Sequence, residues 1–378
     1  MVEAARRPTA PPPPPPLPGE GDFGTVPESL TEIVRLANER GFSDVHLGVG
    51  EEPRYRDRGD ILRTGWPATT PERFEAWMGE ILDAAAIETF RTQKEYDGSH
   101  GFPFVRVRIN LLDTMRGPAM VLRLIPWRIP TMEELELPGV LKQLALRPKG
   151  MVLFTGPTGS GKTTTMASLL EHINLTMRRH IITIEDPVEY LHQSRLGLIR
   201  QREVGRHTRE FHRALRSSLR EDPDVILIGE IRDQETLTTA MEASQTGHLV
   251  LGTLHTNSAI RSVERVLGMY PPQEQESIRR AVAESLLAVI SMGLVKTLDG
   301  ERTGFHEIFI NTDACRDYIQ RGDIYEIERI MQRSGFDGMQ TFNQSLLRLV
   351  EQGRISGEEA IGHSLKPSEL AQALRGRV

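Results

Sequence analysis

The chain has 378 residues, of which 38% are hydrophobic and 26% are charged, and its formal net charge is −6. A chain of this length can bury a large core and form two domains, and its acidic balance argues against general binding to nucleic acid or anionic lipid. A single cysteine, Cys315, excludes an internal disulfide and a four-cysteine zinc motif. The sequence predicts neither a transmembrane helix nor a signal peptide, so we expect a cytoplasmic protein.

Residues 1–26 form a proline-rich tail that contains the run "PPPPPPLPGEGDFG". Consecutive prolines favour extended polyproline II, and the segment has too little apolar surface to fold alone. We interpret it as a disordered tail or spacer. The alternative is a docking peptide for a partner with an aromatic groove.

Residues 27–128 show the mixed pattern of an α+β domain. A helix is predicted within 27–41, and short strands are predicted within 43–50 and 53–63. One capped helix is expected over 70–90, with Thr70 at the cap and Pro71 after it. Alternating residues predict half-buried strands at 104–113 and 118–126. Prolines then punctuate residues 129–142, which we interpret as an interdomain linker.

Residues 143–295 alternate apolar runs of strand length with helical sequence. The predicted strands are "MVLFTG", "HIITIED", "DVILIGE" and "HLVLGTLHT". This alternation is typical of an α/β fold with a mainly parallel sheet covered on both faces. From about Tyr270 onward the chain is expected to be mainly helical, and 296–378 is assigned to a C-terminal helical region.

A phosphate-binding loop follows the first of these strands, where "GPTGSGKT" fits the pattern G-x-x-x-x-G-K-[ST]. Glycines let backbone N–H groups turn toward the phosphates, Lys162 reaches the β- and γ-phosphates, and the Thr163 hydroxyl ligates Mg²⁺. ATP and Mg²⁺ are therefore the expected cofactors. The predicted nucleotide-binding residues are Gly156, Pro157, Thr158, Gly159, Ser160, Gly161, Lys162, Thr163 and Thr164.

The other predicted strands also end in chemically active side chains, and ligands of open parallel sheets bind at these ends. The strands end in Glu185-Asp186, in Glu230 and in His255. An acid after a strand often caps a helix, but the coincidence of several such ends favours an active site. His255 is expected to sense the γ-phosphate. For His248, at the other end of its strand, a structural role and contact with a neighbouring subunit remain open.

Four sequence boxes resemble those of the type II/IV secretion ATPase family, and most closely its type IV pilus retraction (twitching motility, PilT/PilU-like) branch. The boxes are "GPTGSGKTTT", "TIEDPVEY", "LREDPDVILIGEIRD" and "TGHLVLGTLHT", and the resemblance extends to "SDVHL" and "GMQTFNQSL". It implies a RecA-like P-loop ATPase core preceded by a smaller PAS-like domain. The implied function is ATP hydrolysis that drives pilus retraction.

The resemblance also implies roles for individual residues. Glu230 would be the catalytic acid that positions the attacking water, and Gly229 occupies the place where other P-loop enzymes carry an Mg²⁺-binding Asp. Glu185 and Asp186 would act on Mg²⁺ through its water shell. The N-terminal domain would supply arginines to the nucleotide, and the matching residues are Arg108, Arg116 and Arg123. The alternative is that these are exposed strand arginines.

The partners implied by the resemblance are five further copies of the chain in a homohexamer, an inner-membrane pilus platform protein and a paralogous pilus ATPase. No nucleic acid is expected, and the motor would lie peripherally at the inner face of the cytoplasmic membrane. The absence of a four-cysteine zinc motif argues against the pilus-extension and type II secretion relatives. A weakly hydrolysing accessory module, a pilus-assembly or secretion ATPase and a DNA translocase are the alternatives, of which the acidic charge disfavours the last.

Two stretches leave further alternatives open. The retraction branch has a helix A-I-R-N-L-I-R-E, where this chain has "ACRDYIQR", so a main motor, an accessory paralogue and a lineage variant all remain open. A helix within 208–222 is expected to place four arginines on one face. This face could be a solvated surface, a subunit interface, a binding surface for an acidic partner or a nucleic-acid contact. The four arginines are Arg209, Arg213, Arg216 and Arg220.

Overall fold

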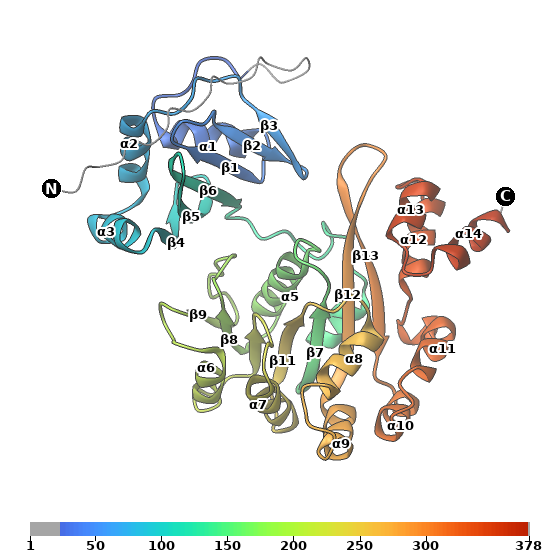
Figure 1. Cartoon of the computed structure of the whole chain (residues 1–378). Coiled ribbons are helices and arrows are strands. Elements are labelled where there is room, and N and C mark those ends of the chain that lie inside the picture. The colour runs from blue at the N-terminus through green and yellow to red at the C-terminus, as the bar shows by residue number, and fades with distance from the viewer. Residues whose placement is uncertain (1–22, 377–378) are drawn as a thin grey trace. The chain divides into compact units, whose positions relative to one another are not determined.

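The computed structural model describes residues 23–376, and the chain divides into two compact units after Arg128. Most of the predicted proline-rich tail, residues 1–22, lies outside the described residues. Figure 1 shows a small sheet with its helices in the first unit and a larger sheet with many helices in the second.

The N-terminal unit is built on a six-stranded antiparallel sheet in the order β3-β2-β1-β6-β5-β4. One core holds apolar residues of α1 and α2 together with those of β1 and β5, so these helices pack on the sheet. The predicted α+β pattern is confirmed here. The elements are α1 Leu30–Glu39, β1 Asp44–Gly48, β2 Arg54–Asp57, β3 Asp60–Arg63, α2 Pro71–Ile81, α3 Ala84–Gln93, β4 Glu95–Gly101, β5 Arg106–Thr114 and β6 Gly117–Ile125.

The single helix expected over residues 70–90 is wrong, because two helices occupy this stretch. Thr70 caps α2 as predicted, but Leu82 is extended (φ −122°, ψ 141°) and ends that helix. The Asp83 carboxylate then accepts the Ala86 N–H at 2.8 Å and starts α3. The apolar spacing continues across the break, so a side-chain cap decided the boundary. Strand β4 was not predicted, because "EYDGSHG" has no alternation of apolar residues.

The second unit contains a seven-stranded sheet in the order β13-β12-β7-β11-β10-β8-β9. All neighbouring strands are parallel except the β12–β13 pair. Successive residues of β7 enter different cores: Met151 and Leu153 pack with α6 and α7, whereas Val152 and Phe154 pack with α4 and α5. The sheet is therefore covered on both faces, as predicted.

The elements of the second unit up to the end of the sheet are α4 Val140–Ala145, β7 Gly150–Thr155, α5 Lys162–Thr176, β8 His180–Glu185, β9 Leu198–Glu203, α6 Phe211–Ser218, β10 Val225–Ile228, α7 Gln234–Gln245, β11 Leu249–Leu254, α8 Ala259–Leu267, α9 Gln275–Ser285, β12 Leu286–Lys296 and β13 Arg302–Ile310. The elements that follow are α10 Asp313–Arg321, α11 Glu326–Arg333, the 3₁₀ turn Gly335–Asp337, α12 Phe342–Glu351, α13 Gly357–His363 and α14 Pro367–Arg375.

The expectation of a mainly helical chain from Tyr270 onward is wrong for the β12–β13 hairpin. β12 follows α9 without a gap, so in the sequence its long apolar run cannot be distinguished from a continuation of the helix. β-branched residues such as Val289, Ile290 and Val295 favour the strand, and pairing with β7 stabilises it. The large sheet therefore continues past residue 295. Beyond β13 the described chain is helical, and α12, α13 and α14 pack on the hairpin.

The prediction that four arginines share one helix face is wrong for two of them. Helix α6 has only 8 residues, so Arg213 and Arg216 lie on it while Arg209 and Arg220 lie outside. The two helical arginines form ion pairs with nearby glutamates at 2.9 and 3.1 Å. No helix in the described part of the chain, residues 23–376, is long and apolar enough to span a bilayer.

Candidate active site

The phosphate loop connects β7 to α5, and its backbone requires glycine. Gly156, Gly159 and Gly161 have φ values of 142°, 79° and 92°, which side chains rarely allow. A Cβ on Gly156 would lie 2.5 Å from the Met292 carbonyl oxygen of β12. Pro157, Thr158 and Gly159 are exposed at the tip of the loop. The loop therefore presents backbone rather than side chains to a ligand.

Lys162 and the start of α5 supply positive charge behind this loop. The Lys162 ammonium donates to the carbonyl oxygens of Gly156 and Pro157 at 2.7 and 2.9 Å. Burial lowers the pKa of Lys162, while the charge of Glu230 opposes that shift. Within residues 23–376 no side chain caps α5, and the buried Ser160 hydroxyl has no partner. These donors fit a phosphate group at a helix N-terminus.

The structure brings Glu230 and His255 together. Strands β7, β11, β10 and β8 are consecutive neighbours, so their carboxyl ends form one edge. His255 Nε2 lies 3.3 Å from Glu230 Oε1, and Arg232 donates to Glu230 Oε2 at 2.7 Å. The hydrogen bond from Arg232 lowers the pKa of Glu230, and the charges of Arg232 and His255 add to the shift. Glu230 is therefore a firmly ionised carboxylate at this edge.

Glu185 lies at the end of β8 and is held by two neutral donors. Thr183 donates to Glu185 Oε1 at 2.6 Å, and Gln201 of β9 donates to the same oxygen at 3.2 Å. Burial raises the pKa of Glu185 despite these two bonds. Glu185 and the exposed Asp186 line a cavity of about 100 Å³ that also reaches Thr163, Gly229 and Glu230. Four of the predicted site residues therefore surround one cavity.

Gly229 is required by the close approach of β10 to β8. Its N–H donates to the Ile184 carbonyl oxygen at 2.7 Å. A Cβ at this position would lie 3.1 Å from both that oxygen and the Glu185 Cα, which are backbone atoms. Backbone atoms cannot rotate away as a flexible side chain does, so a larger residue must shift a strand end. Packing therefore favours glycine at position 229 independently of metal chemistry.

His248 lies at the opposite end of β11 from His255. Its Nδ1 lies 2.9 Å from the Ala243 carbonyl oxygen, at the end of α7. The His248 N–H also donates to that oxygen at 3.2 Å. These local bonds support the structural reading, in which His248 closes the turn between α7 and β11.

Several supporting residues of the site were missed in the sequence. Arg232 lies two residues after Glu230 within "GEIRD", so it was visible but had no assigned partner. Gln201 comes from β9, a strand that was not predicted, and no sequence signal connected it with Glu185. The Tyr190 hydroxyl lies 3.3 Å from the Thr164 hydroxyl and adds a polar contact at the first turn of α5.

The three arginines predicted to act on the nucleotide lie in the N-terminal unit. Arg108 and Arg123 are cross-strand neighbours on β5 and β6. Arg123 donates to the buried Asp44 at 2.9 Å, whereas Arg108 lies 3.7 Å from an exposed aspartate. Arg116, in the β5–β6 turn, is 3.8 Å from Glu51. The structure thus groups Arg108 with Arg123 and places Arg116 at the far end of the hairpin.

The parallel sheet, the phosphate loop and the acids at the strand ends define a P-loop ATPase. Residues 100–354 match the family model of type II/IV secretion system proteins, and the chain belongs to this family. The expected family membership and ATPase class are confirmed.

Known proteins resemble the chain over most of its length. It is 43% identical over 332 residues to the type IV pilus retraction ATPase PilT of Pseudomonas aeruginosa, covering 88% of this chain and 96% of that protein. The type IV pilus ATPase PilU of the same species is 36% identical over 341 residues, covering 90% and 89%. A crystal structure of the pilus retraction motor PilT with bound ADP aligns with a TM-score of 0.83 at 39% identity, covering 91% and 99%.

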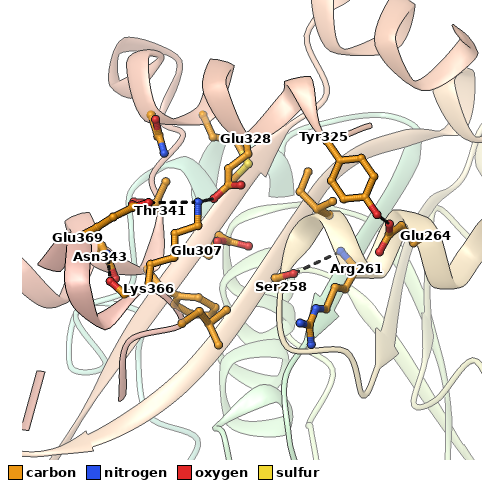
Figure 2. A pocket seen from close by; sticks show the side chains of 15 residues that line it. Ser258, Arg261, Glu264, Glu307, Tyr325, Glu328, Thr341, Asn343, Lys366 and Glu369 are labelled. Carbon is orange, nitrogen blue, oxygen red and sulfur yellow. Dashed lines mark hydrogen bonds and ion pairs between the residues drawn. The ribbon is translucent and has the colours of Figure 1, made fainter. Parts of the chain in front are cut away.

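A second cavity, of about 490 Å³, lies between α8, β13 and the C-terminal helices. Figure 2 shows its lining, in which Lys366 and Glu328 point toward one another and form an ion pair. Glu307 of β13 also lines it and accepts the Ala259 N–H at 2.7 Å, which holds the first residue of α8. Burial raises the pKa of Glu307 to about 7. This carboxyl therefore titrates near neutrality in the folded protein.

We expect Glu307 to make stability depend on pH. Its pKa is raised from 4.5 to about 7, so its contribution to stability is complete below pH 4.5 and is lost as pH rises through 7. The difference corresponds to about 3 kcal/mol in the free energy of unfolding. Glu307→Gln should remove this loss while keeping an acceptor for the Ala259 N–H. Urea unfolding between about pH 5 and pH 8 measures the effect.

Glu369→Gln is the matched control, because Glu369 lines the same cavity and is largely exposed. This variant should keep the pH dependence of the wild type. An equal pH dependence in wild type and Glu307→Gln would contradict the prediction.

Proposed function

We propose that the chain is the subunit of a homohexameric motor that hydrolyses ATP to retract type IV pili. The observation that carries this proposal is the similarity to a pilus retraction ATPase along nearly the whole of both chains. The motor would act at the inner face of the cytoplasmic membrane, against an inner-membrane platform protein of the pilus. The fold and the site at the strand ends support ATP hydrolysis. The similarity to the pilus retraction ATPase supports retraction as the use of that hydrolysis.

The residues at the site also fit Mg²⁺. The Thr163 hydroxyl would bind the metal directly, and Glu185 and Asp186 would bind its water molecules. Both acids border the cavity that reaches Thr163, and magnesium retains several waters readily. When bound, the metal would neutralise charge on the β- and γ-phosphate oxygens. Its site does not need an Asp at position 229, which agrees with the close backbone contact there.

Glu230 would hold the attacking water. Its ionised carboxylate accepts a water hydrogen, and Arg232 and His255 fix the orientation of that carboxylate. A carboxylate with a lowered pKa is a weak base, but phosphoryl transfer through a loose transition state needs positioning more than proton removal. His255, beside Glu230, could also contact the γ-phosphate, as the sequence predicted.

Lys162 and the N-terminus of α5 would bind the phosphates. The ammonium of Lys162 already contacts two carbonyl oxygens of the loop, so only a short movement transfers its hydrogen bonds to phosphate oxygens. The backbone N–H groups of the loop and the Ser160 hydroxyl are the other donors.

Arg108, Arg116 and Arg123 would neutralise charge on the γ-phosphate in the assembled motor. We expect Arg108→Ala to lower kcat by about tenfold or more, because an arginine contact is worth far more in the transition state than in the ground state. The measurement is steady-state ATP turnover. Arg108 is the better position for this test, because replacing Arg123 would also break its ion pair with the buried Asp44. Lys94→Ala, which removes an exposed lysine 3.9 Å from Asp113, is the control. Unchanged turnover in Arg108→Ala would contradict the role.

The second candidate is an accessory ATP-binding module that hydrolyses little alone. The observation that favours it is helix α10, "DACRDYIQR", which departs from the helix of the retraction branch. The similarity to PilU, at 36% identity, is consistent with either reading. A paralogous pilus ATPase would then be the partner.

The deciding experiment is ATP turnover per subunit against protein concentration, with the mass measured by light scattering. Turnover that rises as hexamers form would support a motor with shared active sites. A hexamer that binds ATP but turns it over only when a paralogous ATPase is added would support the accessory module. A fully active monomer would contradict the shared site.

A further inference from the structure

A third cavity, of about 330 Å³, lies away from the strand ends, between β13, α12 and the segment that leads into α4. β13 and α12 pack against each other, as Figure 1 also shows. Gly304 and His306 contribute from β13, Arg348 and Gln352 from α12, and Glu136 from the segment before α4. All of these residues belong to the second unit, so the cavity does not depend on the N-terminal unit.

His306 presents a buried polar atom without a partner. The residue is 4% exposed, and within residues 23–376 its Nε2 makes no hydrogen bond. Its backbone is held on both sides, because its N–H donates to Ser345 Oγ at 3.1 Å and Gln340 donates to its carbonyl oxygen at 3.0 Å. Burial lowers the pKa of His306 to about 4, so the ring is neutral. A buried, unpaired ring nitrogen costs free energy unless a ligand satisfies it.

Gly304 leaves space beside that nitrogen. Residues 304 and 306 of β13 point to the same face, because side chains alternate along a strand. A Cβ on Gly304 would lie 3.0 Å from His306 Cε1 and 3.3 Å from Nε2. A side chain at position 304 would therefore press against the imidazole, so glycine keeps this side of the ring free of a neighbouring side chain at the wall of the cavity.

The charged groups that line this cavity favour an anion. Arg348 is exposed and lies one helical turn from Gln352, so both side chains leave the same face of α12. The Arg354 guanidinium holds the Glu136 carboxylate through two contacts of 2.7 and 2.8 Å. Two arginines thus face a single carboxylate among the lining residues. The Glu136 carboxylate shows that one of them already holds an oxyanion, with a single nitrogen, Nη1, donating to both carboxylate oxygens.

We propose that this cavity binds a phosphate group. Arg348 would hold two of its oxygens, since the planar guanidinium matches phosphate geometry, and neutral His306 would donate its Nε2–H to a third. A phosphate close to Arg354 would compete with Glu136 for that guanidinium. Binding would therefore release the segment before α4 from Arg354, which follows α12 in the chain. The ligand is either free inorganic phosphate or the phosphate of a small monoester.

The test is calorimetric titration of inorganic phosphate into the full chain, saturated with Mg²⁺ and a β,γ-imido ATP analogue that occupies the phosphate loop. We expect one additional phosphate per subunit. Arg348→Gln should weaken its binding by about tenfold or more, because a charge-assisted contact is lost. Gly304→Ala should weaken it similarly by filling the space beside His306. Arg329→Gln, an exposed arginine of α11 paired with Glu326, is the control with the same charge change and should bind as wild type.

AMP in place of inorganic phosphate distinguishes the two sources of the phosphate group. Tighter binding of AMP would identify a phosphomonoester as the ligand, and tighter binding of phosphate would identify the free anion. No binding of either probe up to about 10 mM would overturn the proposal. Equal affinity in wild type, Arg348→Gln and Gly304→Ala would also overturn it, because the bound phosphate would then lie elsewhere. If Gly304→Ala fails to fold, Arg348→Gln decides alone, because Arg348 is exposed.

Discussion

Glu230→Gln is expected to lower kcat for ATP hydrolysis by about 100-fold or more, while the affinity for ATP changes little. The amide keeps the size of the side chain but cannot accept a hydrogen bond through both atoms, so it loses its hold on the attacking water. It also loses the ion pair with Arg232 and weakens the contact with His255 Nε2, which together orient the group. Lys162 and the loop, which bind the phosphates, remain in place. Steady-state turnover and equilibrium binding of a fluorescent ATP analogue measure the two effects.

Glu189→Gln is the matched control for this variant. Glu189 lines the same cavity and raises the pKa of Lys162 through its charge, as Glu230 does. It is not at the end of a parallel strand, so its replacement should change kcat by no more than about threefold. Near-normal hydrolysis in Glu230→Gln, or equal losses in both variants, would show that another group positions the water.

Gly229→Asp, which introduces the carboxylate that other P-loop ATPases have here, is expected to reduce both stability and turnover. The new Cβ would lie 3.1 Å from the Ile184 carbonyl oxygen and the Glu185 Cα, so the ends of β8 and β10 must separate. Overpacking of this kind costs about 1–3 kcal/mol. Because Glu230 is the next residue, the same movement displaces it, and kcat should fall by about tenfold or more. Thermal unfolding and ATP turnover test the two parts.

Gly229→Ala separates the steric effect from the added charge. Alanine has the same Cβ, so it should cause most of the loss in stability and turnover without placing a carboxylate near Glu185. If Asp is tolerated with full turnover, or if Ala is harmless and Asp is not, close backbone contact is not the reason for glycine at this position.

The parts of the site that the sequence predicted depend on local geometry. The loop from Gly156 to Thr163 is defined by spacing alone, because its glycine backbone and its position before a helix are properties of consecutive residues. The acids Glu185 and Glu230 could also be placed, because buried parallel strands deliver their following residues to one edge. The resemblance to a known family then assigned roles that spacing could not.

The parts that were missed depend on contacts between distant residues. Strand β9 supplies Gln201 to Glu185, but its sequence "LIRQRE" has no strong strand pattern and is held by pairing with β8. β12 follows a helix without interruption, and its pairing with β7 and β13 separates it from that helix. The stability of such a strand depends on its pairing with a neighbouring strand, so the sequence of the segment alone does not predict it.

The sequence by itself determined the class of protein, the phosphate loop and which strands end in acids, because these follow from short-range spacing and the alternation of apolar runs. Only the tertiary structure decided which groups contact those residues at the site. It placed Arg232 and His255 on Glu230 and gave Glu185 two donors. It also brought the backbone of β8 so close to Gly229 that a Cβ there would lie 3.1 Å from two backbone atoms. Spacing along the chain does not predict the contact of Gln201 with Glu185 or that of His255 with Glu230, because these residues come from different strands or strand ends.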